Sequence, residues 1–193
     1  MSHYQIPEPQ PTMMKNTQTG YGLVAILLHW IMVLAIFGMF GLGLYMVELT
    51  YYDSWYHGSL ETHKAIGVLV ALVFVVRFGW RQLNPSPAGL STKKLENTAA
   101  HFAHLGLYLV IAVLLVSGYL ISTADGRAVD VFGLFSVPAT LTERGSQEEI
   151  AGEVHEILAW LLMAMVAVHA LAALKHHVIN KDNTLKRMLK PGL

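Results

Sequence analysis

The chain has 193 residues, of which 54% are hydrophobic and only 13% are charged, and its 13 basic residues balance its 13 acidic ones. A soluble domain carries about 25% charged residues, so these values argue against a soluble enzyme, a disordered chain and a nucleic-acid-binding protein. The absence of cysteine excludes disulfides, thiolate metal sites and covalently attached haem, while ten histidines remain as candidate metal ligands. This composition favours an integral membrane protein.

Four segments are candidates for membrane-spanning helices, which need about 20 mostly apolar residues. Residues 16–47, 97–124 and 157–174 contain no Asp, Glu, Lys or Arg. The uncharged stretch between Lys64 and Arg77 is too short to cross by itself, so this span has to extend over residues 60–83 and keep both charges near the membrane surfaces. We predict helices over about residues 22–47, 60–83, 98–122 and 153–178.

Basic residues indicate how these helices are oriented. With four crossings and the N-terminus inside, ten of the 13 basic residues lie on the inner face, and Lys64, Arg127 and Arg144 lie on the outer face. Cytoplasmic loops carry the excess of Lys and Arg. The predicted fold class is an all-α integral membrane protein, a four-helix transmembrane bundle with both termini cytoplasmic. It forms one membrane domain over residues 1–193. The outer loop at 123–152 is long enough to fold over another part of the bundle.

Four histidines lie at matched depths in the predicted spans, where ionisable residues are costly and usually functional. His155 and His169 are separated by about 21 Å of helix rise and by nearly a whole number of turns, so they share one face. His29 is level with His169 near the inner surface, and His63 is level with His155 near the outer surface. The sequence therefore predicts two imidazole pairs, His29 with His169 and His63 with His155.

Two opposed imidazoles can bind one iron from both sides, so each pair suits a haem. Arg77 follows His63 by the spacing that separates His155 from His169, so it lies at the inner level, where a guanidinium can pair with a haem propionate. Gly43 takes the outer position on the face of His29, and Gly67 follows His63 by one turn, so both leave room for a planar ligand. Each residue also has an ordinary interpretation: interhelical hydrogen bonding for the histidines, membrane topology for Arg77 and packing for the glycines.

Further histidines lie near the inner surface. His101 and His104 begin the third span, and His176 and His177 follow the fourth. They could border a cofactor or a quinone headgroup, or be solvated at the membrane surface. A His-lined path or a zinc site is the alternative use of such residues, which would make the chain a non-redox transporter or metal-ion carrier. The separation of about 21 Å between the pairs disfavours one zinc site, whose ligands must lie within about 2.1 Å of the ion.

The ordered set of motifs resembles the bacterial cytochrome b561 family of four-helix membrane cytochromes. The resemblance covers residues 21–188 and rests on His29-Trp30, His63-Lys64-x-x-Gly67, His101-x-x-His104-x-x-x-Tyr108, and His155 with His169. The tail motifs Lys175-His-His177 and Lys181-Asp-Asn-Thr-Leu-Lys-Arg-Met188 are also typical of the family. Segments 51–57 and 117–126 resemble a subgroup that is often linked with a periplasmic lipocalin-like, polyisoprenoid-binding protein.

The resemblance implies two non-covalent haem b groups in a bacterial inner-membrane protein. By this resemblance the iron ligands are His29, His63, His155 and His169. It also implies electron exchange with a membrane quinone such as ubiquinone beside the inner haem, where His176 matches a position close to the quinone. We therefore expect a quinone-linked oxidoreductase or electron carrier in the lipid bilayer that exchanges electrons with a periplasmic partner, and no nucleic-acid partner.

One branch of the family oxidises periplasmic superoxide and passes the electron to ubiquinone, and this is the main alternative. Steering an anion needs a positive potential. The first outer loop, residues 47–61, has no Lys or Arg, and the second has two basic residues against five acidic ones. We therefore expect a neutral or basic partner in preference to superoxide.

Overall fold

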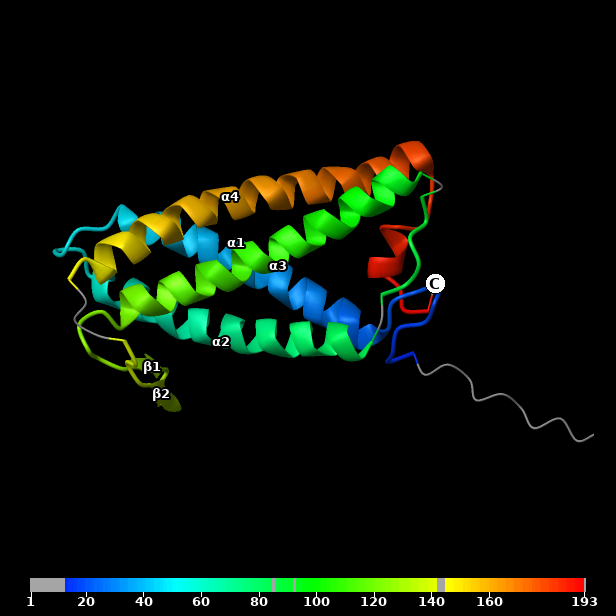
Figure 1. The fold of residues 1–193 in the computed structure, drawn as a ribbon. Helices are drawn as coiled ribbons and strands as arrows, with labels where there is room; N and C mark the ends of the chain where they lie inside the picture. The colour runs from blue at the N-terminus through cyan, green and yellow to red at the C-terminus, as the bar shows by residue number, and fades with distance from the viewer. Residues whose placement is uncertain (1–12, 85, 92, 142–144, 193) are drawn as a thin grey trace, which may run out of the picture.

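The computed structural model describes residues 13–84, 86–91, 93–141 and 145–192. Within those residues, four long helices form the bundle: α1 Leu23–Val47, α2 Tyr56–Leu83, α3 Lys94–Ser122 and α4 Gln147–Lys175 (Figure 1). A π-helical turn, His176–Asn180, continues α4, and a short 3-10 helix, Lys186–Met188, follows it. All four long helices have the length and apolar composition to cross a membrane, which confirms the predicted all-α membrane fold.

Three of the helices begin earlier than the hydropathy pattern predicts. α2 begins at Tyr56, α3 at Lys94 and α4 at Gln147, and not near residues 60, 98 and 153. Hydropathy misses these turns because they are largely polar. In α4, Glu148 and Glu149 occupy the first turn, where carboxylates interact favourably with the positive end of the helix dipole. The connection predicted over residues 123–152 is therefore shorter, and its residues 142–144 lie outside the described residues.

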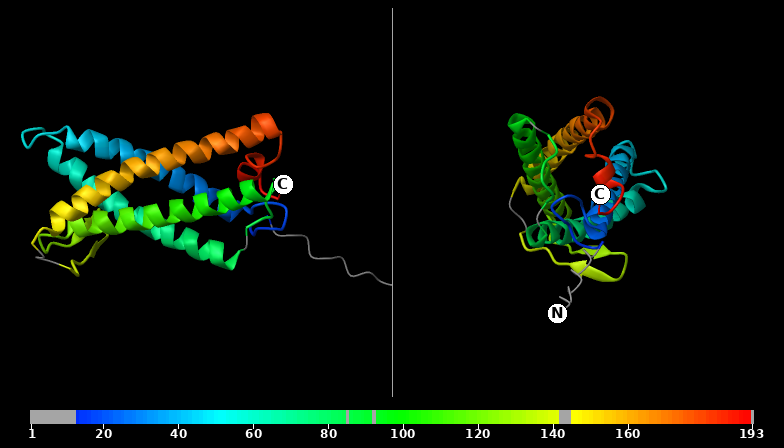
Figure 2. Two further views of the ribbon diagram at one scale, coloured as in Figure 1. Left: turned by 45° about the horizontal axis from the view of Figure 1, so that its top comes forward. Right: turned by 90° about the vertical axis from the view of Figure 1, so that its right-hand side faces the viewer.

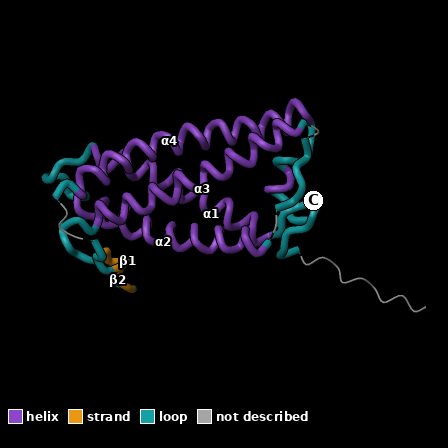
Figure 3. Tube along the Cα trace, viewed as in Figure 1, coloured by secondary structure: helices purple, strands orange, loops and turns teal. Residues whose placement is uncertain are grey.

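The helices pack mainly in two pairs, α1 against α2 and α3 against α4, with a smaller contact between α2 and α3. Among the described residues, α4 makes no comparable contact with α1 or α2. Figures 2 and 3 show the helices running side by side, with both described ends of the chain at one end of the bundle. We call this the terminal end, and we call the opposite end, which carries the two strands, the hairpin end.

Large apolar side chains cover the outside of every helix. Leu34 in α1, Leu72 in α2, Leu109 in α3 and Leu171 in α4 are each more than half exposed. Such surfaces would drive association in water. In a bilayer they face hydrocarbon, so the exposed apolar belt is the surface expected of a membrane-spanning bundle.

Hydrogen bonds between distant segments close the terminal end. Trp30 Nε1 in α1 donates to the Met188 carbonyl oxygen at 2.7 Å. The Arg187 guanidinium donates to the Ala88 carbonyl oxygen, in the connection between α2 and α3, at 2.8 Å. The C-terminal segment is therefore held against both α1 and that connection.

The connection from α3 to α4 folds over the start of α2. Its described residues contain an antiparallel hairpin, β1 Val129–Val131 and β2 Phe135–Val137, in which Val129 pairs with Val137 and Val131 with Phe135. β1 packs against α2, and Val129 and Val131 are 3% and 0% exposed. The segment that this loop covers is thus the hairpin end of α2.

Candidate functional site

At the hairpin end, His63 of α2 and His155 of α4 face one another. Their ring centroids are 6.3 Å apart, and the ring planes meet at 72°. His155 Nδ1 lies 3.0 Å from the Leu114 carbonyl oxygen and 3.2 Å from Ser117 Oγ. A carbonyl oxygen only accepts hydrogen bonds, so Nδ1 of His155 carries the ring proton and donates it. This tautomer leaves Nε2 of His155 with a lone pair for a metal.

At the terminal end, His29 of α1 and His169 of α4 form the second pair, with ring centroids 6.4 Å apart and planes at 62°. Arg77 Nη2 of α2 lies 3.2 Å from His29 Nδ1. A guanidinium only donates hydrogen bonds, so His29 Nδ1 accepts and a neutral His29 ring carries its proton on Nε2. His29 can therefore bind a metal through Nε2 only after Arg77 releases Nδ1.

Both ring separations fit one metal ion between two axial imidazoles. A metal–nitrogen bond of about 2.0 Å, plus about 1 Å from the nitrogen to the ring centre, places each centre roughly 3 Å from the ion. Two rings on opposite sides of one ion are then roughly 6 Å apart, close to the measured 6.3 and 6.4 Å. Within the described residues, no three or more His, Asp or Glu side chains form a candidate metal site. Two facing imidazoles at each end match the number of protein ligands that a bis-histidine haem would take.

The hairpin-end pair also contains a buried polar atom that needs a partner. His63 Nδ1 is buried and has no hydrogen-bond partner among the described residues. Buried polar atoms are nearly always paired with protein or with a water or bound group. The described residues therefore leave one polar atom of this pair without a hydrogen bond. This agrees with a site that binds a ligand.

Glycines lie beside both rings at the hairpin end. A Cβ atom added to Gly43 would lie 3.6 Å from His63 Cε1, and one added to Gly118 would lie 3.0 Å from His155 Cε1. The space that the sequence predicts beside Gly43 therefore lies next to the ring of His63. A Cβ added to Gly67 would lie 3.8 Å from Met39 Cε, so this glycine lies against a side chain of α1.

Sequence reasoning missed the part of α3 that positions His155. Leu114 and Ser117 hold its Nδ1, and Gly118 lies against its ring. A signal was present in the sequence, since Gly118 follows His104 by the same spacing that relates His155 to His169. One face of α3 therefore carries an imidazole at the terminal end and a glycine at the hairpin end.

The two histidines of α3 lie in different surroundings. His104 is half-buried, and its ring centroid lies 5.3 Å from that of His169. His101 is exposed, and its ring contacts Phe102. Of the two, His104 is therefore the one that reaches the terminal-end pair.

Tyr108 lies one turn after His104 and contacts two guanidinium groups. The Arg77 Cζ atom lies 5.9 Å from the centre of the Tyr108 ring, and the Arg81 Cζ atom lies 5.3 Å from it. Cations are attracted to the face of an aromatic ring. Two positive charges are thus held close to the terminal-end histidines by an uncharged side chain.

His176 lies where the chain turns back after α4. Lys181 adopts a left-handed conformation with φ of 55°, and the reversal brings Asp182 Oδ2 to 2.6 Å from His176 Nδ1. Although burial opposes the shift, hydrogen bonds from Thr184 and His176 hold the pKa of Asp182 below its ordinary value. Asp182 is therefore ionised at neutral pH and orients the imidazole of His176.

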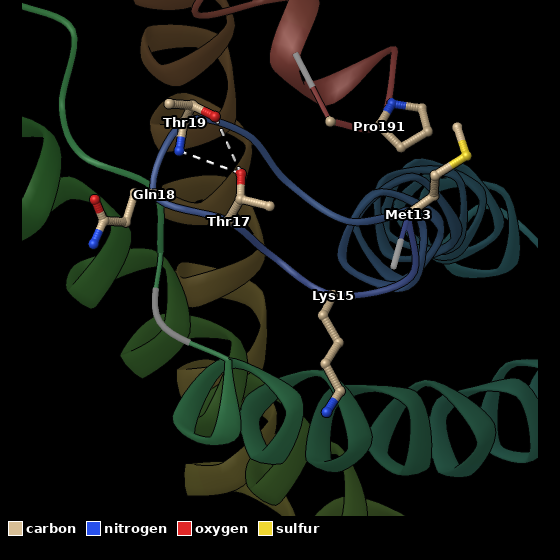
Figure 4. A pocket seen from close by; sticks show the side chains of 7 residues that line it. Met13, Lys15, Thr17, Gln18, Thr19 and Pro191 are labelled. Atoms are coloured by element: carbon tan, nitrogen blue, oxygen red, sulfur yellow. Dashed lines mark hydrogen bonds between the residues drawn. The ribbon is translucent and has the colours of Figure 1, made fainter. Parts of the chain in front are cut away.

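A cavity of about 520 Å³ opens at the terminal end, as Figure 4 shows. It is formed between the N-terminal segment and the C-terminal residues, and its lining comprises Met13, Lys15, Thr17, Gln18, Thr19, Pro191 and Gly192. None of the four paired histidines lines it. The cavity is therefore separate from the two imidazole pairs.

Carboxylates dominate the described surface near His155. Glu148, Glu149, Glu153 and Glu156 are all exposed on the first three turns of α4. The nearby cations Lys64 and Arg127 are already paired, with Glu61 and Asp125 respectively. The hairpin end therefore presents a negative surface beside its imidazole pair.

Comparison with known proteins identifies the same family as the motifs. The sequence model of the family described as prokaryotic cytochrome b561 matches residues 20–191. The chain is 48% identical over 175 residues to cytochrome b561 homolog 2 of Escherichia coli (strain K12), which covers 90% of this chain and 93% of that protein.

Two further relatives are more distant. Cytochrome b561 homolog 1 of Escherichia coli (strain K12) is 30% identical over 143 residues, or 71% of this chain and 78% of that protein. The probable superoxide oxidase CybB of Yersinia pestis is 26% identical over 171 residues, or 88% of this chain and 95% of that protein. The family match spans nearly the whole chain, and the chain carries the four membrane-spanning helices described above. This chain belongs to the prokaryotic cytochrome b561 family, and it is a multi-pass, haem b-binding electron-transfer protein of the bacterial inner membrane.

Proposed function

We propose that this cytochrome carries two haem b groups and transfers electrons between a periplasmic partner and membrane quinone. One haem lies between His63 and His155, and the other lies between His29 and His169. The observation that carries this proposal is the pair of ring separations, 6.3 and 6.4 Å, at opposite ends of one bundle. Haem iron held by these histidines would supply one-electron chemistry.

The hairpin end faces the periplasm in this proposal. Basic residues are concentrated at the terminal end: Lys15, Arg77, Arg81, Lys93, Lys94, Lys175, Lys181, Lys186, Arg187 and Lys190. Cytoplasmic segments carry such an excess. The termini are therefore cytoplasmic, the terminal-end pair is the inner one, and the hairpin-end pair is the outer one.

The Arg77 guanidinium can bond either to His29 or to a haem propionate. Its guanidinium donates to His29 Nδ1 at 3.2 Å, which prevents Nε2 of His29 from binding iron. A haem propionate offers the guanidinium a charged, bidentate partner that an imidazole cannot match. We infer that Arg77 binds a propionate of the inner haem, and that its release lets His29 move its ring proton to Nδ1.

Replacing Arg77 with leucine is expected to lower the reduction potential of the inner haem. Loss of a nearby cation favours the more positive, oxidised iron, and a shift of roughly 60 mV corresponds to a tenfold change for a one-electron couple. Arg77→Lys keeps the charge and should shift the potential less. Redox titration of the purified holoprotein measures both haems, and an unchanged inner potential in Arg77→Leu contradicts the propionate role.

The inner site exchanges electrons with quinone in this proposal. His176 transfers the proton that accompanies oxidation or reduction of the quinone. Asp182 holds the proton on Nδ1 of His176, so Nε2 is the atom that accepts or releases a proton toward the quinone. The bond to Asp182 fixes the ring without using Nε2.

Ubiquinol is expected to reduce the holoprotein in vesicles, and the reduction should be several-fold slower in His176→Ala. Stopped-flow absorbance follows the haem bands, and an unchanged haem content shows that the variant is intact. His101→Ala is the matched control, since His101 is an exposed imidazole at the same end. If ubiquinol does not reduce the oxidised protein and ubiquinone does not oxidise the reduced protein, quinone is not the inner partner.

The negative surface beside His155 favours a basic or neutral periplasmic partner, which includes a lipocalin-like, polyisoprenoid-binding protein. A second candidate is superoxide oxidation, because the relative from Yersinia pestis is named a probable superoxide oxidase. The four exposed glutamates of α4 would slow the approach of this anion. In the same vesicles, rapid reduction of the oxidised haem by superoxide would favour the second candidate.

A further inference from the structure

The tip of the hairpin exposes three large apolar side chains. Phe132 is 54% exposed, Leu134 79% and Phe135 43%. The strands alternate, since Val129 and Val131 are buried against α2 while Asp130 is exposed. The two valines of β1 therefore pack against the bundle. The larger apolar residues at and beside the turn are exposed.

The turn is built so that it projects these side chains. Phe132 has a φ of 54° and Gly133 a φ of 71°, and a bulky residue rarely adopts such a left-handed conformation. The Gly133 backbone nitrogen donates to Asp130 Oδ2 at 2.8 Å, and the Leu134 nitrogen donates to the Val131 carbonyl oxygen at 3.0 Å. These bonds stabilise a tight turn. The exposed phenyl ring of Phe132 does not contribute to them.

The depth of the hairpin can be placed from α2. Its 28 residues rise about 42 Å, which matches a bilayer of about 40–45 Å including the headgroups. Val129 at the root of the hairpin lines a small cavity together with Glu61 and Lys64. Lys64 lies about 12 Å along α2 from its first residue. Glu61 lies about 8 Å along the same helix, and each headgroup layer is about 5–8 Å thick. The root therefore lies between the inner edge of the headgroup layer and the outermost hydrocarbon.

The hairpin also lies beside the bundle and not above it. The end-on view in Figure 2 shows the two strands outside the ring of helices, next to α2. The lipid-facing surface of α2 is apolar, with Leu72 52% and Val75 65% exposed. The tip therefore lies on the outside of the bundle, on the side of α2.

We propose that Phe132, Leu134 and Phe135 insert into the outer leaflet at the level of the lipid headgroups, so that the hairpin is an interfacial membrane anchor. Aromatic and aliphatic side chains bind at this level, where their apolar parts leave water. The anchor fixes the connection between α3 and α4 over the start of α2, close to His63. It also leaves the acidic first turns of α4 as the surface open to a periplasmic partner.

The absence of cysteine makes the test direct, because Leu134→Cys creates one labelling site in the full chain. A nitroxide spin label is attached there in the holoprotein, reconstituted in vesicles of phosphatidylethanolamine and phosphatidylglycerol. Oxygen concentrates in lipid and a nickel chelate stays in water, so the ratio of their effects on spin relaxation reports depth. We expect the oxygen-to-nickel ratio for the label at residue 134 to be higher than for a label in water.

Two matched labels calibrate the result. Leu72→Cys reports the lipid-facing side of α2, and Glu148→Cys reports an exposed position in the first turn of α4 at the hairpin end. The label at 134 should give an oxygen-to-nickel ratio between those of the other two, as a site at the level of the headgroups requires. A label at 134 that behaves like the one at 148 overturns the anchor and leaves the tip in water, as a protein-docking surface requires. An unchanged haem spectrum in each variant shows that the labelled proteins are folded.

Discussion

Purified protein with His155 replaced by alanine is expected to contain about half the haem b of the wild type, because only the inner pair then keeps two axial imidazoles. His155 is the better-prepared ligand of the outer pair, since its Nδ1 is fixed by the Leu114 carbonyl at 3.0 Å and its Nε2 is left unprotonated. The pyridine haemochrome assay, expressed per mole of protein, measures the ratio directly.

His169→Ala should cause the complementary loss, removing the inner haem and keeping the outer one. The two variants are told apart by redox titration, since each retains a different one of the two midpoint potentials. His101→Ala keeps both haems, because its exposed ring belongs to neither pair. A full haem complement in His155→Ala would show that the pair His63 with His155 does not bind haem.

A side chain at Gly118 is expected to displace His155 and to weaken the outer haem site. A Cβ there would lie 3.0 Å from His155 Cε1, which is closer than ordinary carbon contacts, so Gly118→Ala should shift the outer potential and Gly118→Val should lose much of the outer haem. The measurements are haem content and the two potentials, and the inner potential should not change.

Gly152→Ala is the matched control for this substitution. Gly152 lies in α4 near the same end, and a Cβ there would have no atom within 4 Å among its described neighbours. Alanine in a helix is about 0.5–1 kcal/mol more favourable than glycine, so this variant should be as stable as the wild type or more so, with both haems bound. If Gly118→Val behaves like Gly152→Ala, the ring of His155 does not need the space at Gly118.

The four spans could be predicted from sequence because hydrophobic burial in a bilayer is a local property of a segment. An apolar stretch of sufficient length forms a helix in lipid whichever neighbours it has, since its backbone groups must pair within it. The polar first turns of α2, α3 and α4 escaped prediction for the same reason. Hydropathy carries no information about turns such as that of Glu148 and Glu149, which helix-dipole and interfacial contacts stabilise.

The pairing of histidines was also predictable, because the regular rise of a helix converts spacing into depth. The sequence separation of His155 and His169 determines both their levels and their shared face. The spacing could not show the direction of the neighbouring side chains. Only packing between helices decided that Arg77 reaches His29, and that His104, but not His101, reaches His169.

The sequence by itself thus determined the four spans, the two levels of imidazoles and the basic and acidic ends of the bundle. Tertiary structure alone decided which atoms complete each site: the Leu114 carbonyl at His155, the carboxylate of Asp182 at His176, and the fold of the hairpin against α2. The physical reason is the range of the interactions. Hydropathy and helical periodicity act along one segment, whereas these contacts join residues of separate elements and depend on how the elements pack.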